Sequence, residues 1–211
     1  MSKQPTLSAM DLASLLASRV CHDIISPVGA MANGLEVLEE DQGEDMREFA
    51  MDLIAKSAKS ASAKLKFSRL AFGASGSAGA SIDTGDAEEV AQLYMAGEKS
   101  TLEWNGIRSL IPKNRAKLML NLLLLALSSI PRGGSITMNI EGEGDTATFQ
   151  LRCVGTKARV PPEFVEMLNG AFTGDLTAHE IQPYYTILLA QEAGLGITAT
   201  AEGEDIVFAV R

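Results

Sequence analysis

The chain has 211 residues, of which 46% are hydrophobic, and its 27 acidic against 18 basic residues give a formal net charge of −9. This length suits one large domain or two small ones, and this hydrophobic fraction is enough for a packed core, which excludes general disorder. The negative charge argues against a protein that binds nucleic acid or a membrane surface.

The two cysteines and the polar N-terminal residues indicate a cytoplasmic protein. Cys21 and Cys153 are far apart and lack metal-ligand spacing, which fits a reducing compartment better than a disulfide framework. Ser2, Lys3 and Gln4 begin no apolar segment of the kind that a signal peptide contains. The longest apolar run, residues 118–127, is too short to span a bilayer, so we expect no membrane association.

Residues 8–40 are predicted to form one long helix. Ser8 is a suitable N-cap, and Asp11 lies in the first turn, where the helix dipole favours an acidic side chain. Apolar side chains recur at spacings of three and four along this segment and form one stripe: Leu16, Val20, Ile24, Val28, Met31, Leu35 and Leu38.

His22 is predicted to point away from that stripe. It lies about 200° around the helix from Val20 and Ile24, because successive residues advance by about 100°. The other residues on its face are small or polar: Ser18, Ser26, Gly29 and Asn33. A histidine that only packs in a core does not need small or polar neighbours on its helix face, whereas one that must enter another protein's active site does. The pattern therefore indicates an accessible, functional histidine.

A second helix is predicted over residues 45–72, after a turn at residues 42–45. Its buried face is expected to consist of Met46, Phe49, Leu53, Ile54, Ala58, Ala61, Leu65 and Phe72. Two long amphipathic helices with a short connection form an αα-hairpin. A single hairpin would leave much of its apolar face in water, whereas two could pair as a four-helix bundle, so we expect a homodimer.

Charge is segregated along this hairpin. Residues 36–52 contain eight acids and one base, whereas residues 56–69 contain five bases and no acid. Folding near residue 42 places this basic band opposite His22. Two interpretations remain open: a solvated lysine face, or a counter-charge for an anionic group at the histidine and for an acidic docking partner. On the second interpretation, Lys59 and Lys66 bind the partner.

Residues 73–81 are all Gly, Ala or Ser, a composition typical of a flexible linker. We therefore divide the chain into a helical domain over residues 1–73, a linker over 74–81 and a second domain over 82–211.

The second domain alternates between predicted strands and helices. The strands are expected near 81–82 and over 101–104, 135–141, 146–154, 197–201 and 206–210, and the helices over 86–96 (capped by Asp86), 112–130, 161–169 and 181–193. This order predicts an α+β chain in which a helical hairpin precedes an α/β sandwich with helices on one face of a mixed sheet.

The order of hairpin, linker and sandwich resembles the catalytic cores of histidine kinases. The stretch His22-Asp23-Ile24-Ile25-Ser26-Pro27 resembles the H-box of that family, whose usual form is His-Glu-x-Arg-Thr-Pro. Residues 121–126 and 131–136 resemble the N-box helix and the turn after it. The likeness covers nearly the whole chain and implies a histidine-kinase-ATPase-like (GHKL) sandwich.

The residues that bind ATP in that family are replaced here. Leu125 stands where the magnesium-ligating asparagine should be, and Cys153 stands where a carboxylate should read adenine. The glycine-rich phosphate loop is replaced by residues 181–186, which include Pro183. Leucine cannot bind a hard cation, and proline has no backbone N–H for a phosphate. We therefore expect no ATP binding, no cofactor and no metal ligand in this chain.

A histidine on a kinase-like hairpin beside a degenerate ATP domain resembles the histidine phosphotransferases of alphaproteobacteria. This resemblance implies a dimeric phosphotransferase of the cell cycle in which His22 is the phospho-acceptor. It implies a CckA-like hybrid kinase as donor, through its receiver domain, and CtrA-like and CpdR-like response regulators as acceptors. Magnesium is expected only on the partner receiver.

The resemblance also assigns roles to the neighbours of His22. Asp23 aligns with the H-box acid, which orients or deprotonates the ring, and Ser26 can donate a hydrogen bond to the phosphate. Partner contacts are expected from four further residues of the first helix: Arg19, Ile25, Gly29 and Asn33. Lys157 and Arg159 lie where the ATP lid would approach and are either solvated or in contact with a receiver. His179 has no such companions and is predicted to be a loop residue.

Two other functions remain open at this point. An ATP-dependent histidine kinase would bind nucleotide and phosphorylate itself. A non-catalytic dimeric scaffold on the same fold would keep its function when His22 is replaced by alanine.

Overall fold

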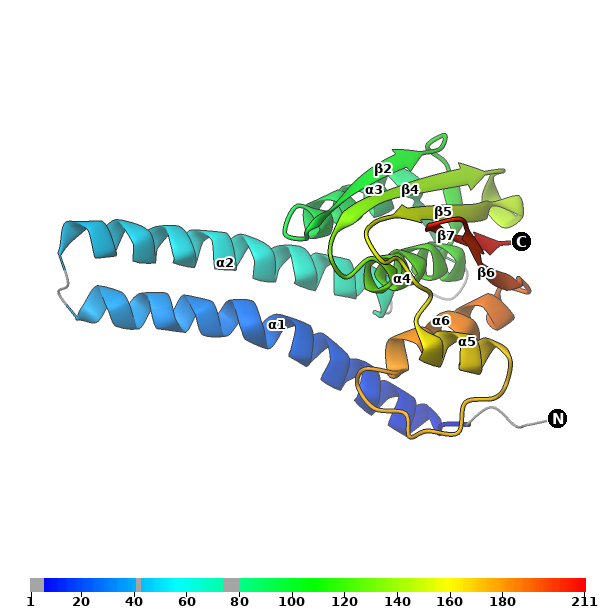
Figure 1. Ribbon diagram of the computed structural model, residues 1–211, viewed down its shortest axis with the longest axis horizontal. Helices are drawn as coiled ribbons and strands as arrows, with labels where there is room; N and C mark the ends of the chain where they lie inside the picture. Colours follow the sequence, from blue (N-terminus) through cyan, green and yellow to red (C-terminus); the bar gives the residue numbers. More distant parts are fainter. Residues whose placement is uncertain (1–5, 41–42, 74–79) are drawn as a thin grey trace.

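The computed structural model describes residues 6–40, 43–73 and 80–211. Its first two helices, α1 (Ala9–Glu39) and α2 (Glu44–Ala71), lie side by side as the predicted hairpin (Figure 1). Ser8 caps α1 as expected, because its hydroxyl accepts a hydrogen bond of 3.1 Å from the backbone N–H of Asp11. Residue 42 of the predicted turn lies outside the described residues.

The remaining elements form the α/β sandwich. In chain order they are β1 (Ser81–Asp83), α3 (Thr84–Met95), β2 (Ser100–Asn105), β3 (Leu110–Pro112), α4 (Lys113–Ser129), β4 (Gly134–Glu141), the 3-10 turn η1 (Gly144–Thr146), β5 (Thr148–Val154), α5 (Pro162–Leu168), α6 (Ile181–Glu192), β6 (Ile197–Glu202) and β7 (Asp205–Val210).

The main sheet has the strand order β2-β4-β5-β7-β6. Strands β2 and β4 run parallel and the other neighbours run antiparallel, so the sheet is mixed. Helix α4 packs against β5 and β7, and α6 packs against α4 (Figure 1). The predicted fold class, a helical hairpin followed by an α/β sandwich, is confirmed.

Two local predictions need correction. Strand β3 was not predicted, and it pairs antiparallel with β1 in a separate two-stranded sheet. Helix α3 is capped by Asp83, not by Asp86: the Asp83 carboxylate accepts hydrogen bonds from the Gly85 N–H and the Arg108 guanidinium, both at 2.8 Å. Ser81 belongs to β1, and residues 74–79 of the predicted linker lie outside the described part of the chain.

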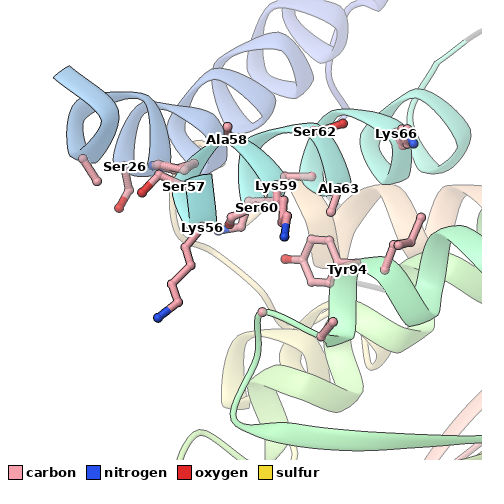
Figure 2. A pocket seen from close by; sticks show the side chains of 16 residues that line it. Ser26, Lys56, Ser57, Ala58, Lys59, Ser60, Ser62, Ala63, Lys66 and Tyr94 are labelled. Carbon is pink, nitrogen blue, oxygen red and sulfur yellow. The ribbon is translucent and has the colours of Figure 1, made fainter. Parts of the chain in front are cut away.

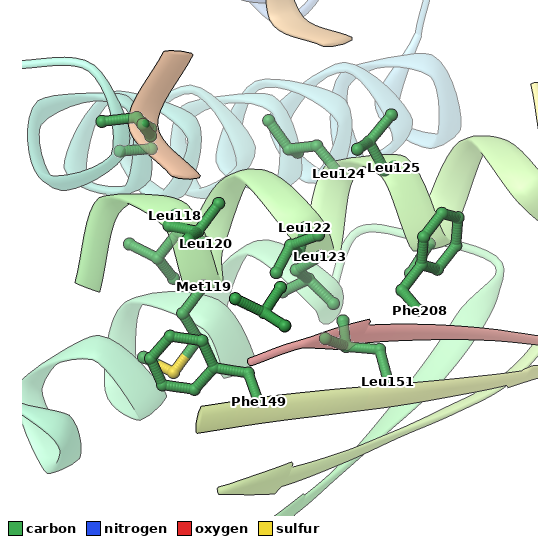
Figure 3. Close-up of a cluster of buried hydrophobic side chains, with 14 of the residues drawn as sticks. Leu118, Met119, Leu120, Leu122, Leu123, Leu124, Leu125, Phe149, Leu151 and Phe208 are labelled. Carbon is green, nitrogen blue, oxygen red and sulfur yellow. The ribbon is translucent and has the colours of Figure 1, made fainter. Parts of the chain in front are cut away.

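The core is centred on α4, which is buried on almost every side. Its side chains from Leu118 to Leu125 fill the space between the sheet and the other helices, where they meet Phe149, Leu151 and Phe208 (Figure 3). A helix that is apolar all round is one that other elements surround. The apolar run over residues 118–127 is therefore the centre of this core.

The same core continues into the hairpin. Phe67 and Ala71 near the end of α2 belong to it, and Leu12, Leu15 and Leu16 of α1 pack against it. One half of the hairpin is thus fixed to the sandwich, while the other half projects away from it (Figure 1).

The projecting half and its surroundings expose large apolar side chains. Val28 and Leu35 of α1 are 46% and 54% exposed, although both belong to the predicted apolar stripe. Phe49 and Leu65 of α2 are 59% and 50% exposed. None of the helices in residues 6–40, 43–73 and 80–211 has both the length and the apolar character needed to cross a bilayer.

Candidate functional site

His22 lies at mid-length on the outer side of α1, and 62% of its side chain is exposed. Its Nδ1 atom is 3.5 Å from Oδ1 of Asp23. The other carboxylate oxygen of Asp23 accepts a hydrogen bond of 2.9 Å from Nε of Arg19, one turn earlier. Asp23 is therefore placed between a guanidinium and the imidazole, and it lies on the Nδ1 side of the His22 ring.

Pro27 follows His22 by five residues and lies inside α1. It cannot donate a backbone hydrogen bond to the carbonyl of Asp23, which permits a local bend. Figure 1 shows that α1 changes direction near its middle and diverges from α2 towards its N-terminal end. Pro27 itself is buried, so the bend is packed against the neighbouring helix.

An open cleft of about 1020 Å³ lies beside the histidine, between the hairpin and α3. Ser26 lines it from α1, Lys59 and Lys66 line it from α2, and Tyr94 lines it from α3 (Figure 2). The structure thus brings three predicted site residues to one surface. His22 does not itself line this cleft but lies one turn before Ser26.

Tyr94 connects the sandwich to this region. Its ring packs against Phe67, with ring centroids 4.5 Å apart. Burial raises the pKa of its phenol above the usual range, and the charges of Glu98 and Asp23 raise it further, whereas Arg19 opposes them. Tyr94 is therefore a neutral hydrogen-bonding group near the Arg19–Asp23 pair, which the sequence alone did not indicate.

The other predicted partner-binding residues are all exposed. Ile25, Gly29 and Asn33 lie on the outer face of α1, with Ile25 69% exposed and open space around Gly29. Lys157 and Arg159 are exposed in the segment between β5 and α5. No contact joins these two basic residues to His22.

His179 is the residue that the sequence analysis placed least well. It does lie in the loop before α6, but its ring meets that of His22, with centroids 5.2 Å apart and planes inclined by 75°. Helix α6 contacts α1, and this packing brings the two rings together. The predicted loop position of His179 is therefore confirmed, whereas its contact with His22 was not predicted.

The region between α4 and α6, which the sequence resemblance assigns to nucleotide binding, is occupied by side chains that hydrogen-bond within the protein. Asn121 is fully buried, and its amide donates to the carbonyls of Ala71 and Lys117. Gln182 donates to the carbonyl and side-chain oxygens of Asn121 and to the hydroxyl of Thr186. These polar atoms are already satisfied within the protein.

The residues that replace the kinase ligands do not fit ATP with magnesium. Leu125 and Cys153 are completely buried in the core. Burial raises the pKa of the Cys153 thiol to about 12, so it is not a thiolate at neutral pH. Across residues 6–40, 43–73 and 80–211, no group of three or more His, Cys, Asp or Glu side chains is arranged to hold a metal ion.

Comparison with known proteins points to one family. The family described as histidine phosphotransferase C-terminal domain matches residues 84–205. A protein phosphotransferase, ChpT of Brucella abortus (strain 2308), is 54% identical over 209 residues, which cover 99% of both chains. A solved structure of a bacterial phosphotransferase is 51% identical, covers 100% of both chains and superposes with a TM-score of 0.93.

Proposed function

Because the chain belongs to the histidine phosphotransferase family, we propose that it relays a phosphoryl group between receiver domains through His22. The donor is the receiver aspartate of a CckA-like hybrid histidine kinase, and the acceptors are the receivers of CtrA-like and CpdR-like response regulators in cell-cycle control. The observation that carries this proposal is the exposed imidazole of His22, whose Nδ1 faces Asp23.

The chemistry at His22 needs few groups from this chain. The lone pair of Nε2 attacks the phosphorus of the aspartyl phosphate, and the bond from phosphorus to the carboxylate oxygen breaks. The proton on Nδ1 stays in place, where Asp23 accepts it as a hydrogen bond and balances the positive charge of the phosphorylated ring. The step reverses on the next receiver, because both phosphoryl linkages are high in energy.

The surface around His22 suits an acidic receiver. Lys59 and Lys66 supply positive charge at the cleft, and the exposed Ile25 supplies an apolar contact beside the histidine. The hydroxyl of Ser26 is placed one turn beyond His22, where it can donate to the phosphoryl group. Arg19, Gly29 and Asn33 complete this surface, and Lys157 and Arg159 form a second basic site for a receiver. Magnesium is supplied by the receiver's own acidic pocket.

The closed interior between α4 and α6 supports a role as a relay protein, as opposed to a kinase. Asn121 and Gln182 satisfy each other and the backbone, and the ligand positions carry Leu125 and Cys153. The chain therefore takes its phosphoryl group from a protein, without a nucleotide cofactor. We place this relay in the cytoplasm, where the free thiols of Cys21 and Cys153 stay reduced.

The active form is a homodimer in which two hairpins make a four-helix bundle. The exposed Val28, Leu35 and Phe49 are covered by the second hairpin in this arrangement. Phe49→Lys is expected to give a monomer in sedimentation equilibrium. Met10→Lys, at a residue that is 79% exposed near the start of α1, serves as the matched control and should remain dimeric.

The proposed relay is tested by mixing the protein with a phosphorylated receiver of a CckA-like kinase. We expect the label to appear on the protein in an acid-labile, alkali-stable form, and we expect His22→Ala to remain dimeric but take no label. Label on the His22→Ala variant, or full biological function of that variant, would instead favour another acceptor residue or a scaffold.

A further inference from the structure

The two imidazoles of this chain, which contains only two histidines, lie against each other. His22 belongs to α1, whereas His179 belongs to the segment between α5 and α6 of the sandwich. Their centroids are 5.2 Å apart and the ring planes are inclined by 75°, which is an edge-to-face contact. Both side chains remain open to solvent.

His179 is held in this position by a hydrogen-bonded turn. Its backbone N–H donates to the hydroxyl of Thr177 at 3.2 Å, and the N–H of Ile181 donates to the carbonyl of Thr177 at 3.0 Å. The Glu180 carboxylate accepts from the N–H of Thr177 at 3.2 Å. The turn leads directly into α6, which packs on α1, so the ring contact is a consequence of the fold.

A purely structural contact is the simplest alternative, since edge-to-face aromatic pairs stabilise many proteins. That role would need a ring at position 179 but not an ionisable one. The position of His179 favours a second role, because a phosphoryl group on His22 would place three negatively charged oxygens beside it. An imidazole is partly protonated near neutral pH and can then act as a cation and a hydrogen-bond donor.

We propose that His179 is a positioning residue for the phosphoryl group on His22, with its protonated imidazole stabilising the phosphoryl oxygens during transfer. This inference rests on the proposed role of His22 as phospho-acceptor. The other charged or titratable groups at this place are Arg19 and Asp23 on α1, Glu180 beside His179, and Tyr94 on α3. In phosphoryl transfer the developing charge spreads over the three equatorial oxygens, which is where a neighbouring cation acts.

Phosphoramidate allows this role to be tested without any receiver. The lone pair of Nε2 on neutral His22 attacks the phosphorus of phosphoramidate whose nitrogen is protonated, the phosphorus–nitrogen bond breaks, and ammonia leaves with the bonding pair. The Nδ1 proton stays on the ring, which becomes a phosphorylated imidazolium, and total charge is conserved. The rate constant for phosphorylation is measured by mass spectrometry of the intact protein at pH 6.5 and at pH 8.5.

His179→Phe and His179→Ala separate the charge of His179 from its packing. Phenylalanine keeps a ring against His22 but cannot be protonated, whereas alanine removes both properties. We expect both variants to be about fivefold slower than wild type at pH 6.5, with a smaller difference at pH 8.5, because the proposed role belongs to the protonated ring. Each variant is compared with wild type at the same pH.

A His179→Phe variant that matches wild type at pH 6.5 would overturn the proposal, since packing alone would then explain the contact. Equal slowing of both variants at the two pH values would also overturn it. Thermal unfolding of each variant shows whether its fold is kept, and His179→Phe remains informative if alanine loosens the turn. If wild type takes no phosphate on His22, the proposed function fails. If substitutions at His179 leave the rate constant for phosphorylation unchanged, the role of His179 fails but the proposed function stands.

Discussion

Two regions of this molecule carry polar side chains at positions that the sequence resemblance to histidine kinases singles out. One is the outer face of α1 around His22, and the other is the contact between α4 and α6 inside the sandwich. At the first, the side chain of His22 is 62% exposed, its Nδ1 faces Asp23 and its ring contacts that of His179. At the second, Asn121 and Gln182 are buried and hydrogen-bonded to each other.

The two regions differ in accessibility. A polar group that is buried and fully satisfied stabilises the fold, whereas an exposed group with a fixed orientation can react. On the proposed function, His22 is the residue that acts on other molecules, whereas the contact between α4 and α6 belongs to the core. The sandwich now serves to hold α1 and to bring Tyr94 and His179 to the region of His22.

The largest expected effect comes from the packing that joins the two regions. Phe67 is 1% exposed and packs against Tyr94, so Phe67→Ala should lower the free energy of unfolding by about 3–5 kcal/mol. Urea denaturation measures this change. Ile107→Ala, at a residue that is 77% exposed, is the control and should change it by less than about 0.5 kcal/mol. Equal effects of the two variants would mean that the hairpin and the sandwich are not joined through Phe67.

Asn121→Ala should separate stability from activity. It removes the hydrogen bonds to the carbonyls of Ala71 and Lys117 and takes one of the acceptors of Gln182 away. We expect a loss of about 1–3 kcal/mol in unfolding free energy, with the rate of phosphoryl uptake by His22 unchanged within about twofold. A variant that unfolds like wild type but takes up phosphate much more slowly would show that Asn121 still has a functional role.

Asp23→Asn tests the accessible region around His22. It removes the negative charge that faces Nδ1 of His22 and accepts from Arg19. Because the contact with the ring is long, we expect uptake to slow by about tenfold, or about 1.4 kcal/mol, with the fold retained. Stopped-flow or quench-flow transfer from a phosphorylated receiver measures this rate. Asp11→Asn, near the start of the same helix, should leave it unchanged, and an equal effect of both variants would point to a general charge effect.

The smallest effect is expected at Lys117, a buried residue of α4 whose Nζ is 3.4 Å from the Tyr185 hydroxyl. Burial lowers the pKa of this lysine, and the charge of Lys113 lowers it further. The unfolded chain therefore binds more protons, so this group makes stability rise as the pH increases towards the usual lysine range. Lys117→Met should be up to about 1 kcal/mol more stable than wild type at pH 7, and this gain should shrink near pH 10. A less stable variant at pH 7 would show that the charged ammonium is favourably paired.

The long periodic elements could be predicted from the sequence because their patterns are local. The stripe along α1, the cap at Ser8 and the outward position of His22 depend on helical spacing alone. The cap of α3 was misplaced because Asp83 and Asp86 are both acceptable caps. Asp83 takes this role, and Arg108, on a distant segment, binds Asp83 at 2.8 Å and Asp86 at 3.3 Å. Strand β3 was missed because three residues are too few to show a period.

The part of the candidate site that lies on α1 was predicted from the sequence, whereas the residues that the second domain contributes were not. His22, Asp23 and Arg19 are neighbours on one helix, so their contact follows from sequence spacing. Tyr94 and His179 reach the region of His22 only through the packing of α3 on α2 and of α6 on α1. No local pattern encodes such contacts, because they depend on how a shared core fixes the hairpin to the sandwich.

The most direct test of the central claim compares two phosphoryl donors on the same protein and identifies the modified residue by mass spectrometry under alkaline conditions. One sample receives ATP with magnesium, and the other receives a phosphorylated receiver domain. We predict phosphate on His22 in the second sample and none in the first. Phosphate acquired from ATP alone, or found on another residue after incubation with the receiver, would contradict this account.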